Sequence, residues 1–140
     1  MNEDMTGAKL GRANLSRADL KLVKLNQADL TKANLSLAKL TGANLTGANL
    51  TGANLSRADL TKADLTGANL SRANLAGANL TLANFTGANL AGANLTADLS
   101  RANLSFAHLS GANLTGANLD DVIGADFTGA LNVPEKYLKD

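Results

Sequence analysis

Residues 41–60, TGANL TGANL TGANL SRADL, contain one five-residue unit four times in succession. The last residue of the unit, Leu, recurs every five residues from Leu10 to Leu95, with Phe85 as the one substitute. It recurs again every five residues from Leu99 to Leu119. Ala stands two residues before each marker, except at Val23. Asn or Asp usually separates Ala from Leu, and Ser or Thr usually follows the Leu. The chain is therefore built on a repeat of period five, and this repeat decides the architecture.

Neither an α-helix nor a flat strand can hold such a repeat. In an α-helix five residues advance by about 500°, so successive Leu residues would spiral around the axis without forming an apolar face. In a flat strand side chains alternate between the faces, and because five is odd, successive Leu residues would fall on opposite sides. All Leu residues can share one side only if the chain turns a corner in every repeat, with Ala and Leu inward. The pattern therefore predicts a solenoid with coils stacked about 4.8 Å apart.

The tandem unit Ala-(Asn/Asp)-Leu-(Ser/Thr)-X resembles the pentapeptide-repeat motif, and the resemblance covers Thr6 to Leu119. It implies an all-β fold, a right-handed quadrilateral β-helix with about twenty residues in each coil. The chain would then make about six coils and a rod about 30 Å long. Many members of the family are bacterial. Stacking at this spacing would align one outward column, whose amides could form a ladder: Asn14, Asn34, Asn54, Asn74 and Asn94.

Two departures interrupt the repeat. One residue is missing near 96–97, while the inward Ala and Leu are intact on both sides. We therefore expect one corner to be tightened or distorted there. After Leu119 the register is lost, and residues 120–123 are predicted to form a loop insertion.

The end of the chain differs from the repeats in composition. Pro134 suits the first position of a short helix. We therefore divide the chain into a β-helix over 1–132 and a C-terminal capping helix over 133–140. The residues expected to fold over the last coil and close it to edge pairing are Val133, Tyr137 and Leu138.

Composition and spacing argue against an enzyme. The chain has no Cys, which excludes thiol catalysis, disulfides and Cys-ligated metals. Its one His, His108, takes an outward position near Ser105 and Ser110, with Asp98 about half a coil away. A Ser-His-Asp triad needs converging groups and an oxyanion hole, which flat outward columns do not provide. We therefore predict no catalytic, cofactor-binding or metal-binding residue and no cofactor.

Charge is uneven along the chain, although the net charge is only +1. Residues 9–39 are basic, whereas residues 120–140 are acidic. The basic stretch is a candidate patch for an anionic partner, formed by Lys9, Arg12, Arg17, Lys21, Lys24, Lys32 and Lys39. No aromatic residues are interleaved with these bases, so base stacking is not expected and a nucleic acid is not the predicted partner.

The resemblance also implies an alternative function. Some pentapeptide-repeat proteins inhibit or protect a DNA topoisomerase, gyrase, by mimicking duplex DNA. Duplex DNA presents one negative charge per about 1.7 Å of axis. The repeat region of this chain instead contains more Lys and Arg than Asp and Glu, so its charge has the wrong sign for a DNA mimic.

The sequence as a whole predicts a non-catalytic structural or protein-binding solenoid. We expect its partner to be a protein rather than a small-molecule substrate or a membrane, and the molecule to be a monomer or an end-to-end homodimer. The candidate contact surfaces are Phe106, at an exposed corner, and the open N-terminal edge around Met5, Ala8 and Leu10. No signal peptide or membrane-spanning run is recognised, so a cytoplasmic protein is expected.

Overall fold

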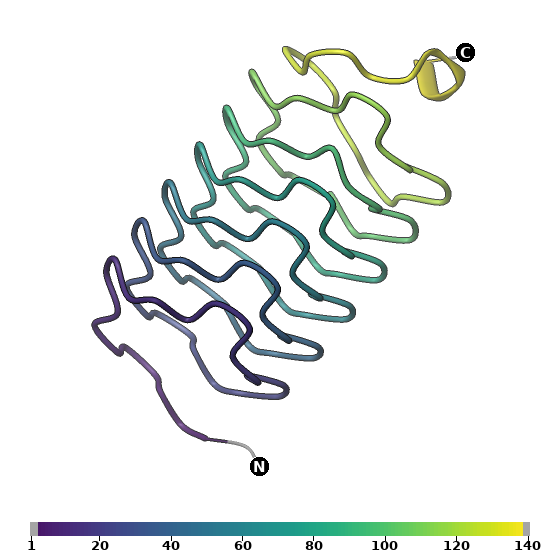
Figure 1. Ribbon diagram of the computed structural model, residues 1–140. Coiled ribbons are helices and arrows are strands. Elements are labelled where there is room, and N and C mark those ends of the chain that lie inside the picture. Colours follow the sequence, from purple (N-terminus) through teal and green to yellow (C-terminus); the bar gives the residue numbers. More distant parts are fainter. Residues whose placement is uncertain (1–2, 139–140) are drawn as a thin grey trace.

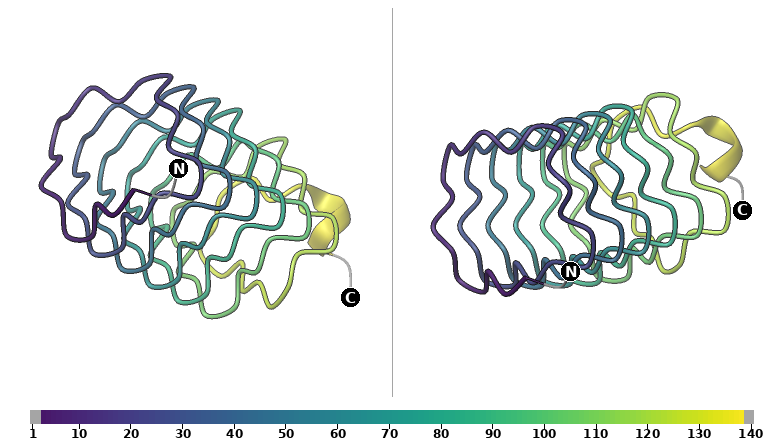
Figure 2. Two further views of the ribbon diagram at one scale, coloured as in Figure 1. Left: turned by 90° about the horizontal axis from the view of Figure 1, so that it is seen from below. Right: turned by 60° about the horizontal axis from the view of Figure 1, so that its bottom comes forward.

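The computed structural model describes residues 3–138, which wind into a stack of coils with the two ends of the chain at opposite ends of a rod (Figure 1). Each outward residue pairs in parallel with the residue twenty positions later, from Asp4 with Lys24 to Asn74 with Asn94. A corner every five residues gives the coil its four-sided outline (Figure 2). Each side contributes a single bridge residue, so no longer strand forms between residues 3 and 138. The one helix in this part of the chain is η1, a 3-10 helix over Glu135–Leu138.

Each corner is a β-turn that begins at the Leu of the repeat. The carbonyl of Leu10, for example, accepts the N–H of Ala13 at 3.0 Å. The third residue of the turn takes a left-handed backbone conformation, in which glycine is free of strain. Gly42 fills this position with a φ of 65°, whereas Leu37 occupies it with a φ of 61°. The corner therefore stores strain wherever its third residue carries a side chain.

Replacing Leu37 by Gly is expected to stabilise the protein by up to about 1 kcal/mol. The side chain of Leu37 is exposed, so little burial is lost, while the left-handed strain of a residue with a Cβ is relieved. Leu37→Ile should instead destabilise the protein, because a β-branched residue is especially unfavourable at positive φ. Urea unfolding of the two variants measures both effects. Equal stability of the two variants would show that backbone strain at this corner is negligible.

The interior is a continuous stack of Leu and Ala side chains. Between residues 25 and 119 the side chains at the Leu position are at most 2% exposed, Phe85 included. The two ends are looser: Met5, Leu10, Leu15 and Leu20 in the first coil are partly buried, as are Val122 and Phe127 near the other end. The predicted inward placement of Ala and Leu and outward placement of the residue between them is confirmed.

The outward residue of each repeat caps the following corner. Asp59 shows the arrangement: its Oδ1 accepts the N–H of Thr61 at 3.0 Å and the Thr61 hydroxyl at 2.6 Å. Asn34 makes the same pair of bonds with Ser36, at 3.0 and 2.8 Å. This Asx turn explains why Asn or Asp at one position of the repeat is coupled to Ser or Thr two positions later.

The Asx turns make the protein sensitive to acid. Hydrogen bonds from the hydroxyl and the N–H of the Thr two positions later lower the pKa of three exposed carboxyls, Asp4, Asp29 and Asp126. At Asp59 partial burial raises the pKa, but the bonds from Thr61 and Thr41 outweigh that effect and the net shift is downward. A carboxyl whose folded pKa is lowered contributes stability above its unfolded pKa, and this contribution is lost as the pH falls through the folded pKa.

Thermal stability should therefore fall as the pH is lowered below about 4. A variant with Asn in place of these aspartates should lose less, because Asn accepts the same hydrogen bonds without titrating. The four changes are Asp4→Asn, Asp29→Asn, Asp59→Asn and Asp126→Asn. Melting temperatures of both proteins between pH 7 and pH 2 test this. Parallel curves would mean that other groups set the acid sensitivity.

The missing residue near 96–97 shortens one corner. The carbonyl of Leu95 accepts the N–H of Ala97 at 2.8 Å, two residues on instead of three. The pairing distance then drops from twenty to nineteen residues, as in Asn79 with Asp98 and Asn94 with Asn113. The stack continues through this corner because Ala97 and Leu99 remain buried.

The predicted loop insertion at 120–123 is wrong. Asp121 occupies the left-handed corner position, and Ile123 pairs with Asn103 exactly one regular coil away, so these residues form a repeat in register. The irregularity follows them and is a shortening. Asn113 pairs with Leu131 only eighteen residues later, because no Leu follows Ile123 and Gly124 bends the chain directly into the next unit.

The tail contains a short helical segment within the predicted range 133–140. Pro134 precedes this segment, which is a single turn of 3-10 helix, η1. Val133 and Tyr137 pack against the core, and the Tyr137 hydroxyl donates to Asp120 Oδ1 at 2.7 Å. Leu138 does not fold over the last coil and is exposed. Residues 139–140, part of the predicted cap, lie outside the described residues.

Candidate functional site

The side of the rod has a hollow where the coil is shortened. Its volume is about 580 Å³, and it is lined by Ser105, Phe106, Ala107, His108, Gly124 and Asp126. Pairing spans twenty residues at Asn103 and eighteen at Asn113, so the wall of the rod is two residues short between these points. A Cβ on Gly124 would lie 3.1 Å from the Cα of Ser105, so only glycine fits this close approach without adjustment. The hollow is thus a direct consequence of the irregular register.

Phe106 dominates this hollow. It occupies a left-handed corner with a φ of 60° and is 83% exposed, the most exposed of the large apolar side chains between residues 3 and 138. In the coil before it, Gly87 occupies the same corner, so no side chain lies beneath the ring on that side. A rigid aromatic ring on a bare corner is a suitable anchor for a partner, because aromatic residues contribute strongly at interface centres.

The polar groups around Phe106 do not form a catalytic arrangement. Asp126 Oδ1 accepts the N–H and the hydroxyl of Thr128, at 3.0 and 2.6 Å, so its carboxylate is committed to a corner. The His108 side chain is exposed, and no hydrogen bond joins it to Ser105 or Ser110 in the part of the chain that the structure describes. Asp98 lies on another face of the rod, where it pairs with Asn79.

The described residues also contain neither a cluster of potential metal ligands nor a long apolar helix. Between residues 3 and 138, no group of three or more His, Cys, Asp or Glu side chains is placed to hold a metal ion. Over the same residues, none of the helical structure has the length and apolar character needed to cross a membrane.

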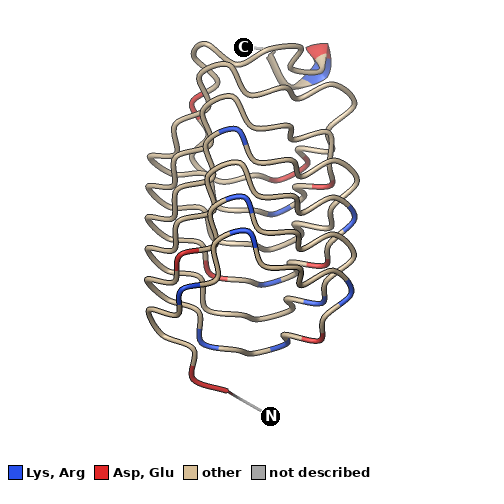
Figure 3. Ribbon diagram, turned by 60° about the vertical axis from the view of Figure 1, so that its left-hand side comes forward, with Lys and Arg blue, Asp and Glu red and all other residues tan. Residues whose placement is uncertain are grey.

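The seven bases of the predicted patch do not lie on one face of the rod. Lys9, Lys24 and Lys39 lie on three different sides, each paired along its column with Asp residues. Lys21 lies 3.9 Å from Asp19 in an exposed ion pair. Of the seven predicted bases, only two share a corner column, Arg12 and Lys32. Figure 3 shows the bases distributed over several edges of the rod.

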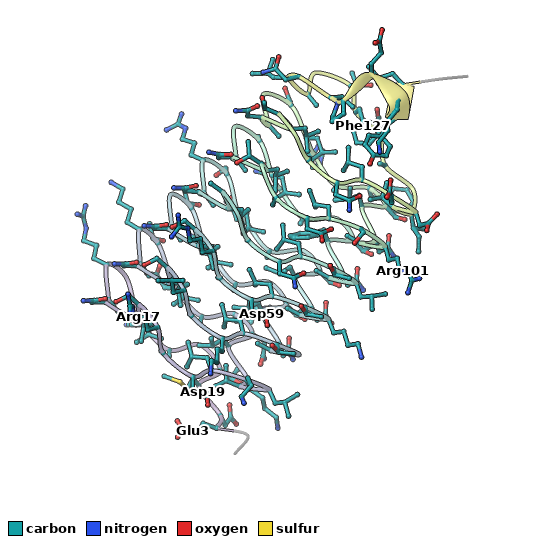
Figure 4. The ribbon with its side chains drawn as sticks, turned by 45° about the vertical axis from the view of Figure 1, so that its right-hand side comes forward. Glu3, Arg17, Asp19, Asp59, Arg101 and Phe127 are labelled. Atoms are coloured by element: carbon teal, nitrogen blue, oxygen red, sulfur yellow. The ribbon has the colours of Figure 1, made fainter. Side chains whose placement is uncertain are left out.

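The predicted N-terminal contact edge has a mixed character. A depression there is lined by Glu3, Asp19, Leu20, Lys21 and Val23. Figure 4 shows Glu3 and Asp19 close together at this end of the rod, and Phe127 at the opposite end near η1. Charged side chains therefore border the partly exposed apolar residues of the first coil.

A family model for pentapeptide repeats matches residues 4–36, 38–75, 63–96 and 97–131, with eight copies. The chain belongs to the pentapeptide repeat family. Proteins of this family form right-handed quadrilateral β-helices, which is the architecture expected from the resemblance and observed here. A match that reaches residue 131 also agrees with repeats that continue past residues 120–123.

Several solved structures are similar to this pentapeptide repeat protein. HetL, a protein involved in heterocyst differentiation regulation from the cyanobacterium Nostoc, is 37% identical over 94% of this chain and 77% of that chain, with a TM-score of 0.44. A pentapeptide repeat protein from the Arabidopsis thaliana thylakoid lumen is 35% identical over 74% of this chain and 69% of that chain, with a TM-score of 0.53. QnrB1, a plasmid-mediated fluoroquinolone resistance protein, is 24% identical over 97% of this chain and 83% of that chain, with a TM-score of 0.48. A search of curated proteins returned no match.

Proposed function

We propose that this pentapeptide repeat protein is a non-catalytic binding module that holds a protein partner against the hollow at Phe106. The observation that carries the proposal is the exposed Phe106 ring beside a depression in an otherwise regular wall. Burying the ring in a partner would remove apolar surface from water, and its corner is held by the stacked coils, so little ordering is required on binding. The neighbouring His108 and Asp126 can supply a polar rim.

The partner can be identified by photocrosslinking from position 106. A photoreactive phenylalanine analogue placed at position 106 should crosslink one discrete protein in extracts of the native host. The matched control is the same analogue at position 82, where Leu82 is an exposed residue in the same left-handed corner position. Equal crosslinking from both positions, or none from 106, would overturn the proposal.

The partner's affinity is then measured with purified proteins. Phe106→Gly should weaken binding at least tenfold, the size expected for an interface anchor. The folded rod should be unaffected, because glycine is the residue that fits a left-handed corner best. If Phe106→Gly binds the partner as tightly as the unmodified protein, the hollow is not part of the interface.

The alternative of a gyrase-binding DNA mimic is disfavoured by the distribution of charge. One outward column alternates Asp with Lys, in Asp19, Lys39 and Asp59, and the other columns are interrupted by Asn or Lys, so no continuous acidic face forms. We therefore expect no inhibition of gyrase supercoiling by the purified protein at physiological salt. Inhibition at low micromolar protein that persists on adding salt would make topoisomerase binding the leading function.

We further infer that the rod contains about six coils and that the tail caps its end. Two contacts support the cap: the packing of Val133 on the core and the hydrogen bond from Tyr137 to Asp120. A covered terminal coil would leave the side of the rod, rather than this end, available to partners.

A further inference from the structure

One side of the rod carries basic residues and no acidic ones. We call it the asparagine face, because its centre is the column of Asn14, Asn34, Asn54, Asn74 and Asn94, which pair in series. It comprises residues 11–17, 31–37, 51–57, 71–77 and 91–97, which contain no Asp or Glu. Its two bordering corners carry five exposed bases: Arg12, Lys32 and Arg72 along one edge, and Arg17 and Arg57 along the other.

The centre of the asparagine face presents hydrogen-bond donors. Each amide oxygen of the column accepts a backbone N–H two residues on, as in Asn14 with Ser16 at 3.2 Å and Asn54 with Ser56 at 3.0 Å. A backbone N–H can donate only to the amide oxygen, so this bond fixes which way each amide is turned. The expected amide ladder does not form, since the oxygens bond within their own repeats. The NH₂ groups, each with two donors, are left for an acceptor outside the chain.

The bases follow one another along the axis in steps of one or two coils. Adjacent coils are about 4.8 Å apart, so Arg12 and Lys32 are separated by one such step. Lys32 and Arg72, and likewise Arg17 and Arg57, are two coils or about 10 Å apart. The five bases thus extend over about 14 Å, a length in which one strand of duplex DNA presents about four to five phosphates at 3.4 Å intervals.

We propose that the asparagine face binds the phosphate backbone of duplex DNA. A linear, regularly charged polyanion fits two straight rows of cations around a row of amide donors, and such contacts require no particular base sequence. A single strand fits less well, because no aromatic side chain on this face can stack on bases. The sequence predicts no nucleic-acid partner because no aromatic residues are interleaved with the N-terminal bases, but contacts to the duplex backbone require no base stacking. Stacking of the coils brings Arg57 and Arg72 onto the same face as Arg12, Arg17 and Lys32.

Fluorescence anisotropy with a labelled 20-base-pair duplex tests the proposal. With five phosphate contacts, the slope of log K against log salt should be about −4.5. Replacing Arg57 and Arg72 together by Gly should reduce the slope to about −2.7 and weaken binding at least tenfold at 0.1 M salt. Both residues occupy left-handed corners, at φ of 59° and 60°, where glycine is favoured, so the variant should remain folded.

The matched control removes the same charge from another edge. Lys62→Gly with Arg101→Gly changes two exposed residues with φ of 61° at a corner that does not border the asparagine face. Figure 4 shows Arg101 on a different edge of the rod from Arg17. The control should change the slope little. An equal loss of duplex affinity in the two double variants, or a salt slope near zero for the unmodified protein, would overturn the proposal.

Competition identifies the class of polyanion. Unlabelled competitors are added at equal charge to the preformed complex with the labelled duplex. They are the same duplex without label, single-stranded DNA, poly-glutamate, heparin and vesicles containing anionic lipid. The duplex should compete best, and stronger competition by any of the others would contradict the proposal. Phe106→Gly should bind the duplex normally, because Phe106 occupies a different corner, so this test and the test of the protein-binding hollow fail independently.

Discussion

Leu60→Lys is expected to unfold the protein at room temperature. Leu60 has no exposed surface and lies among leucines in the middle of the rod. The substitution loses about 2 kcal/mol of burial and places an ammonium group where no buried polar partner is available. Together these costs are comparable with the whole stability of a small domain, about 5–15 kcal/mol. Far-UV circular dichroism and a thermal melt measure the loss of structure.

The control introduces the same lysine at a corner of the next repeat. Gly67 has a φ of 67°, and a side chain there would meet no atom within 4 Å. Lys32 and Lys62 already occupy equivalent corners. Gly67→Lys should therefore cost only about 1 kcal/mol, from the strain of a left-handed residue with a side chain. Similar melting of the two variants would mean that the interior admits water or charge.

The period of five was sufficient to predict the solenoid because it acts through burial. Only a corner in every repeat keeps all the Leu side chains on one side, and the buried fraction of Leu60 follows from that geometry. The four-sided coil needed the family resemblance, because period five alone does not set the number of repeats in a coil. The Asx turns were not foreseen, although the coupling of Asn or Asp with Ser or Thr was their signal in the sequence.

The error at residues 120–123 has a simple physical origin. Leu marks the register of the repeat along the sequence, but residues 120–123 contain no Leu. Val122 takes the inward position and Ile123 the outward one, so the sequence does not show that the repeat is regular here. Pairing of backbone groups does not depend on these side chains, so the coil continues through them. The missing residues come afterwards, at Gly124, where the absence of a Cβ permits the close approach to Ser105.

The candidate sites were predictable to different extents. The exposure of Phe106 follows from its corner position and was predicted, but the hollow beside it depends on a change of register that is visible only in the folded structure. The asparagine column was predicted from the twenty-residue spacing. Its role as a row of donors was not, because that role depends on the amide oxygens being engaged by the backbone, as at Asn34.

Phe85→Ala should cost about 3–5 kcal/mol of unfolding free energy, the largest effect expected from an uncharged substitution in this rod. Phe85 has no exposed surface and stacks between Leu65 and Leu104 in adjacent coils, where the backbone holds the walls apart and limits collapse around a cavity. Phe85→Leu restores the usual residue and should cost less than about 1.5 kcal/mol. Phe106→Ala, the same truncation at an 83% exposed site, should change stability by less than about 0.5 kcal/mol. Urea unfolding of the three variants decides the matter, and a comparable loss for Phe85→Ala and Phe106→Ala would show that Phe85 does not support the stack.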